Sequence, residues 1–147
     1  MELKIDRGLK TYEVEDIDGT PLGVIKINPA DLGIVGRFAQ TRDAIAAMAE
    51  KVSDKADPEL LNEIDADIKA EVNKIFGSDV ASIFFGGISA LALCDDGSMV
   101  FEKILEAIAP IIEDAVGDAM KASRKRMEKY TAAYAAPDKG LVPGQQA

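Results

Sequence analysis

Few side chains in this 147-residue chain could carry out covalent or metal chemistry. The chain contains no histidine and no tryptophan, and Cys94 is its only cysteine. Serine-hydrolase triads, cysteine–histidine pairs, histidine-ligated metals and four-cysteine zinc sites are therefore excluded, as is a disulfide within the chain. We therefore expect a protein that is not an enzyme and that holds no cofactor and no metal.

Three short motifs resemble parts of known sites but lack the residues that those sites need. Residues 16–19 (Asp-Ile-Asp-Gly) lack the further acidic positions of a calcium loop, and we interpret them as a turn. Asp65 and Asp67 are two residues apart on a predicted helix, where such side chains face apart, so they are a poor catalytic pair. Gly86-Gly87 lacks the lysine and hydroxyl residue that follow in a phosphate-binding loop.

The charge of the chain is strongly acidic and unevenly distributed. Seventeen basic residues against 26 acidic ones give a net charge of −9, which disfavours nucleic acid and anionic membranes as partners. Residues 121–129 are the exception, because five cations and one glutamate give this stretch a net charge of +4. Two interpretations stay open: the cations complement the negative end of a long helix, or they meet a specific acidic partner.

Targeting and membrane signals are weak. Residues 1–6 do not follow the charged-then-apolar pattern of a signal peptide. The longest uncharged stretch, 80–94, has 15 residues and contains Gly86-Gly87, whereas a spanning helix needs roughly 20 apolar residues. A lone thiol is typical of a reducing compartment. We expect a cytoplasmic protein without a membrane span.

The first half of the chain predicts a β-hairpin followed by two helices. Residues 10–17 and 23–28 are β-prone runs on either side of an Asp-Gly turn. Asn28-Pro29 is a typical helix start, and the helix is expected to continue to about Ser53. Asp57-Pro58 starts the next helix, which Gly77 ends. Its apolar residues step by three and four positions: Leu61, Ile64, Ile68, Val72 and Ile75.

The second half predicts two or three further helices. A short helix is expected to end at Gly86-Gly87, and the apolar run 88–94 favours another. A long helix is then expected to reach about Tyr134, with a kink near Pro110. The overall prediction is a mostly helical α+β fold with a hairpin and four to five helices. It forms one domain over 1–136, followed by a loose Pro/Gly-rich tail at 137–147.

The order of these segments, together with three short motifs, resembles a known protein family. The motifs are Asn73-Lys74-Ile75-Phe76-Gly77, Phe84-Phe85-Gly86-Gly87 and Arg124-Lys125-Arg126-Met127-Glu128-Lys129-Tyr130. Over roughly residues 10–134 the chain is similar to tail-morphogenesis proteins of phages and prophages of Gram-positive bacteria, and through them to phage tail assembly chaperones. The resemblance implies a non-catalytic protein that coats the tape-measure protein and helps tail-tube subunits polymerise around it.

For the partner-binding surface we predict a set of aromatic residues with basic residues that steer the partner: Phe84, Phe85, Tyr130, Tyr134, Arg124, Lys125 and Arg126. The phenylalanines could instead be core residues, and the tyrosines could pack locally. A homo-oligomer is expected. Two other classes stay open, a structural virion protein (a minor tail or connector component) and a regulator of a host factor.

Overall fold

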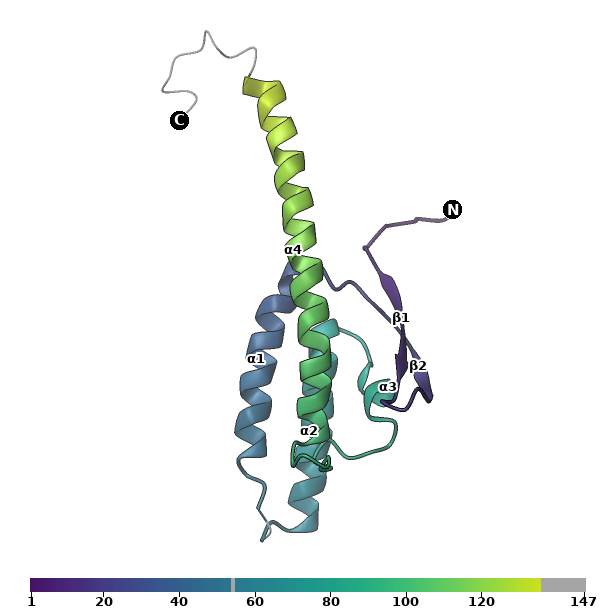
Figure 1. Ribbon diagram of the computed structural model, residues 1–147, viewed down its shortest axis with the longest axis vertical. Coiled ribbons are helices and arrows are strands. Elements are labelled where there is room, and N and C mark those ends of the chain that lie inside the picture. The colour runs from purple at the N-terminus through teal and green to yellow at the C-terminus, as the bar shows by residue number, and fades with distance from the viewer. Residues whose placement is uncertain (54, 136–147) are drawn as a thin grey trace.

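The computed structural model describes residues 1–53 and 55–135, with side chains as far as residue 129. Within this range the fold is α+β, with an N-terminal hairpin and four helices, which confirms the predicted class (Figure 1). The elements in chain order are β1 (Lys10–Glu15), β2 (Pro21–Ile27), α1 (Leu32–Ala49), α2 (Pro58–Phe76), α3 (Ala81–Phe85) and α4 (Val100–Ala135). The predicted tail at 137–147 lies outside the described residues.

The hairpin is an antiparallel pair with one irregularity near its turn. Lys10 pairs with Ile27 and Val14 with Gly23, and the register shifts between Val14 and Glu15. The turn is closed by two backbone bonds, from the Gly19 amide to the Asp16 carbonyl and from the Asp16 amide to the Thr20 carbonyl. A two-stranded hairpin is only marginally stable by itself, so it depends on the helical layer beside it.

Helices α1 and α2 lie side by side and are both capped by aspartate (Figure 1). The Asp57 side chain accepts from the Leu60 amide, and Gly77 ends α2 in the left-handed conformation, as predicted. The predicted start of α1 at Asn28-Pro29 is wrong by three residues. Asn28 instead caps a turn by accepting from the Ala30 amide, and Asp31 caps the helix by accepting from Gly33.

The hydrophobic core forms where α1, α2 and the first half of α4 meet β2 and α3. Ile45, Ile68, Val72 and Ile75 are completely buried in it. Arg37 on α1 links α1 to α2, since its Nε donates to the Ile75 carbonyl at 3.0 Å. The same guanidinium pairs with Asp31 at 3.0 Å and therefore links the start of α1 to the end of α2.

Helix α4 runs without a break through 36 residues, and the kink predicted near Pro110 is not confirmed. Pro110 is exposed, so the carbonyl that loses its helical partner can be satisfied by water. The predicted helix at 88–94 is wrong. This segment forms turns and one bridge between Leu93 and Met99, and the Ala90 amide donates to Asp65 Oδ1 at 2.7 Å rather than to a helical carbonyl.

Candidate binding groove

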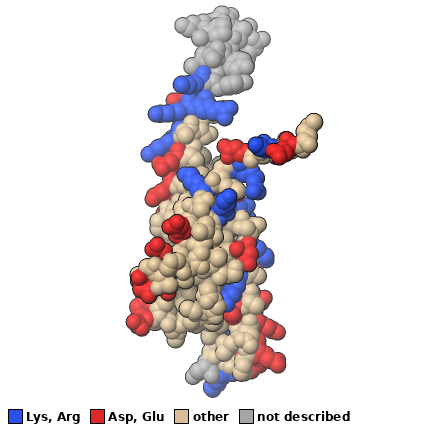
Figure 2. Space-filling view, turned by 90° about the vertical axis from the view of Figure 1, so that its right-hand side faces the viewer, with Lys and Arg blue, Asp and Glu red and all other residues tan. Residues whose placement is uncertain are grey.

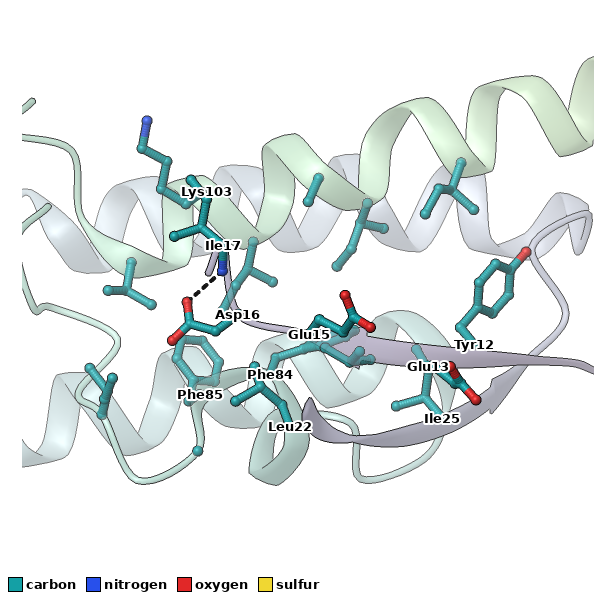
Figure 3. Close-up of a pocket in the computed structure, with 18 of the residues that line it drawn as sticks. Tyr12, Glu13, Glu15, Asp16, Ile17, Leu22, Ile25, Phe84, Phe85 and Lys103 are labelled. Carbon is teal, nitrogen blue, oxygen red and sulfur yellow. Dashed lines mark hydrogen bonds between the residues drawn. The ribbon is translucent and has the colours of Figure 1, made fainter. Parts of the chain in front are cut away.

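An apolar groove of about 900 Å³ lies between the hairpin and α4. We call it the hairpin–α4 groove. Figure 3 shows the hairpin on one side, α4 on the other and α3 at the base, with Leu22, Ile25 and Phe84 among the lining residues. Val100, Ile104, Ile108 and Ile111 line it from α4 at helical spacing. The apolar stripe of α4 is therefore shared between the core and this open space.

The base of the groove is held by Asn73, which lies near the end of α2. Its Oδ1 accepts from the amides of Val80 and Ala81, both at 2.8 Å, and so satisfies the first amides of α3. Phe84, which α3 carries, meets Phe76 edge to face with ring centroids 6.5 Å apart. The position of the two α3 phenylalanines therefore depends on one side-chain oxygen from α2.

We expect Asn73→Ala to lower the free energy of unfolding by about 1 to 3 kcal/mol, because it removes the side-chain acceptor of the Ala81 amide and leaves the Val80 amide with only the Ser78 carbonyl, at 3.0 Å. Chemical denaturation followed by circular dichroism measures this change. Asn73→Asp is the matched control, since it keeps an acceptor oxygen at the same place. Equal losses for the two variants would contradict the capping role.

The hairpin wall of the groove packs closely on α3. Gly23 on β2 has a φ of +150°, and a Cβ built there would come within 2.6 Å of the Ile83 side chain. A side chain at this position would be strained at this φ and would force either the Ile83 side chain or the hairpin to shift. Gly23 thus sets how closely the hairpin wall approaches the base of the groove.

The mouth of the groove exposes apolar side chains to solvent. Ile17 at the hairpin turn is fully exposed, Ile88 after α3 is 52 % exposed and Ile111 on α4 is 41 % exposed. All three line the groove. Isolated exposed apolar residues are normal on protein surfaces, but a contiguous apolar hollow is a candidate binding site.

Acidic side chains surround this apolar surface. Glu13, Glu15 and Asp16 lie on the hairpin side, and Asp95 lies in the loop before α4. None of these four makes an ion pair with a residue that the structure describes. A fifth carboxylate, Asp96, pairs with Lys103 at 2.6 Å. Figure 2, which looks onto this side of the molecule, shows a broad uncharged area bordered by acidic and some basic groups.

The pairing with Lys103 and the Ser98 amide hold the pKa of Asp96 well below its usual range. A lowered pKa in the folded state means that this carboxylate favours folding above its unfolded pKa, and that the contribution is lost as pH falls through the folded pKa. We therefore expect the Asp96 carboxylate to stay ionised in acid well below the usual pKa of an aspartate. Carboxyl chemical shifts followed by NMR during acid titration measure this, and an ordinary midpoint for Asp96 would contradict it.

The residues predicted for partner binding lie in two places. Phe84 is half-buried and Phe85 is 3 % exposed, and both line the groove. Lys69 lies over the Phe85 ring at 5.4 Å from its centroid, which covers that ring on the other side. Arg124, Lys125 and Arg126 lie instead on the far part of α4, where all three are exposed. The side chains of Tyr130 and Tyr134 lie outside the described residues.

Sequence reasoning missed the main walls of the groove, above all Ile17, Ile104 and Ile111. A usable signal was present in α4, where apolar residues occupy more of the helix circumference than one packing interface needs. Ile17 gave a second signal, as a large apolar residue next to an exposed Asp-Gly turn.

Comparisons with protein-family models, curated proteins and solved structures found no match to this chain. No described helix is long and apolar enough to cross a membrane. Over the described residues, no cluster of three or more histidine, cysteine, aspartate or glutamate side chains could hold a metal ion. Among the features described above, the groove points most directly to a function.

Proposed function

We propose that this protein is a non-catalytic phage tail assembly chaperone that acts in the bacterial cytoplasm. It binds an apolar, helical segment of the tape-measure protein in the hairpin–α4 groove and keeps that protein soluble while tail-tube subunits assemble. The observation that supports this proposal most directly is the groove itself, open to solvent and lined by isoleucine, leucine and phenylalanine. The sequence resemblance supplies the identity of the partner.

A helical segment fits the shape of the groove. The wall formed by α4 runs from Val100 to Ile112, which at 1.5 Å per residue is about 18 Å, or three turns of a partner helix. Apolar side chains at helical spacing on the partner would meet the isoleucines of α4. The acidic border around the groove adds a preference for basic residues on either side of that apolar face.

A structural virion protein is the second candidate, and the uneven charge of the chain favours it. The far part of α4 is basic and the groove is acidic, so copies of this chain could assemble through their own surfaces. Such a protein would be present in purified virions, whereas an assembly chaperone would be absent from them. Mass spectrometry of purified particles separates the two.

Co-expression with the tape-measure protein tests the proposal. We expect a soluble complex that carries many copies of this chain per long partner, measured by affinity purification and size-exclusion light scattering. An insoluble tape-measure protein, with this chain running alone, would contradict it. The matched control is Val35→Glu, which changes an exposed apolar residue on α1 outside the groove and should leave complex formation unchanged.

A further inference from the structure

The far part of α4 projects beyond the rest of the fold (Figure 1). Every side chain from Met120 to Lys129 is exposed, so nothing in the described structure packs on this segment. We call residues 120–129 the α4 tip. Short isolated helices are marginal in water, and most helical stability in proteins comes from packing of one face. A bare tip of this kind is expected to pack against something.

The tip presents two methionines on one face. Met120 and Met127 are seven residues apart, which is two helical turns, and they are 42 % and 58 % exposed. Arg124 follows Met120 by four positions and precedes Met127 by three, so it lies on the same face. Methionine is flexible and polarisable, which suits it to packing into an irregular apolar hollow.

The charges of the tip and the groove are complementary. Within the tip, five cations and one glutamate give a net charge of +4. Among the residues that line the groove, five carboxylates and one lysine give −4. Figure 2 shows a group of basic side chains at the upper end of α4, whereas lower on the molecule acidic and basic side chains are mixed. The two surfaces are on different parts of one chain, so one copy can offer its tip to the groove of another.

We infer that the hairpin–α4 groove binds the α4 tip of a second copy of this chain, in a head-to-tail contact. The methionines occupy the apolar hollow, and the arginines and lysines face Glu13, Glu15, Asp16 and Asp95. Such a contact is heterologous, so it repeats from copy to copy and forms a ring or an open chain. A tape-measure segment that enters the same groove would displace the tip.

Direct pairing of two α4 tips is disfavoured by the same charges. Side-by-side tips would bring two segments of net charge +4 together, and like charges across a helix pair are destabilising. Docking of the tip on the acidic groove removes this repulsion and also covers exposed isoleucines. The charge distribution therefore favours binding of the α4 tip to the groove of another copy over its pairing with a second tip.

Two variants test the inference, each of which disables one half of the contact. Glu15→Lys with Ile111→Lys changes the net charge of the groove lining from −4 to −1 and leaves the tip intact. Arg124→Glu with Met127→Glu changes the net charge of the tip from +4 to +1 and leaves the groove intact. All four positions are exposed, so the fold should be retained, and circular dichroism checks this. Association of the chain alone is measured by sedimentation velocity over a wide concentration range. Val35→Lys, outside both surfaces, is the control and should associate like the unchanged protein.

We expect the unchanged protein to self-associate and each double variant to associate at least tenfold more weakly. An equimolar mixture of the two variants should form a discrete heterodimer, because one intact groove meets one intact tip. A monomeric unchanged protein, a groove variant that associates normally, or a mixture that forms no heterodimer would each overturn the inference. The experiment contains only this chain, so a negative result would overturn the head-to-tail contact alone. Binding of the tape-measure protein is tested separately by co-expression.

Discussion

Replacing Ile68 with alanine will lower the free energy of unfolding by about 3 to 5 kcal/mol. Ile68 lies in the middle of α2, is completely buried and belongs to the cluster that joins all the helices. Alanine removes three carbons from this cluster and leaves a cavity that well-packed neighbours can close only in part. Because domains of this size have total stabilities of about 5 to 15 kcal/mol, this loss is a large fraction of the whole.

Urea denaturation followed by circular dichroism measures this loss. Ile17→Ala is the matched control, because it makes the same chemical change at a fully exposed position and should shift stability by less than about 0.5 kcal/mol. Ile68→Val, which removes a single methylene, should fall between the two. Similar stabilities for the alanine variants at the two positions would mean that α2 is not the centre of the core.

If the groove binds the tape-measure protein as we propose, replacing Ile111 with glutamate will weaken that binding by about tenfold or more, or roughly 1.4 kcal/mol. Ile111 lines the groove and is 41 % exposed, so glutamate is tolerated in the free protein. A bound apolar helix would force this new carboxylate out of water without a partner, which is unfavourable. The acidic groups already present around the groove add repulsion.

The amount of tape-measure protein that stays soluble on co-expression, and the dissociation constant of the purified complex, both report this loss. Val35→Glu adds the same charge on α1, at a residue that is 48 % exposed and outside the groove. It should bind like the unchanged protein. Equal weakening by the two variants would show that total charge, rather than the groove, decides binding.

Local sequence signals were sufficient to predict most of the secondary-structure elements. Asp57-Pro58, the three-and-four stepping of apolar residues and Gly77 defined α2 because caps and periodicity act within a few residues. The prediction of a helix at 88–94 was wrong because a short apolar stretch has no periodicity that distinguishes a helix from irregular chain. The true conformation of this segment depends on long-range bonds, such as that from the Ala90 amide to Asp65 Oδ1 at 2.7 Å.

The candidate site was harder to predict from the sequence than the fold. Phe84 and Phe85 were identified as a cluster by their adjacency, yet the α4 wall that faces them lies about 20 positions further along the chain. Only the packing of the hairpin and α3 leaves one side of α4 open. The basic group at 121–129 was visible as a charge run, but its place on a projecting helix and its distance from the phenylalanines come from tertiary structure.

The central claim is that the hairpin–α4 groove holds the partner, and Cys94 offers a direct probe of it. Cys94 is the only cysteine of the chain, is half-buried and lines the groove. The measurement is the rate at which a small thiol reagent modifies Cys94 in the free protein, at dilutions where it is monomeric and no second copy occupies the groove, and in the purified complex with the tape-measure protein. We predict slower modification in the complex, with the free rate restored for Ile111→Glu. A stable complex in which Cys94 reacts as fast as in the free protein would contradict the claim.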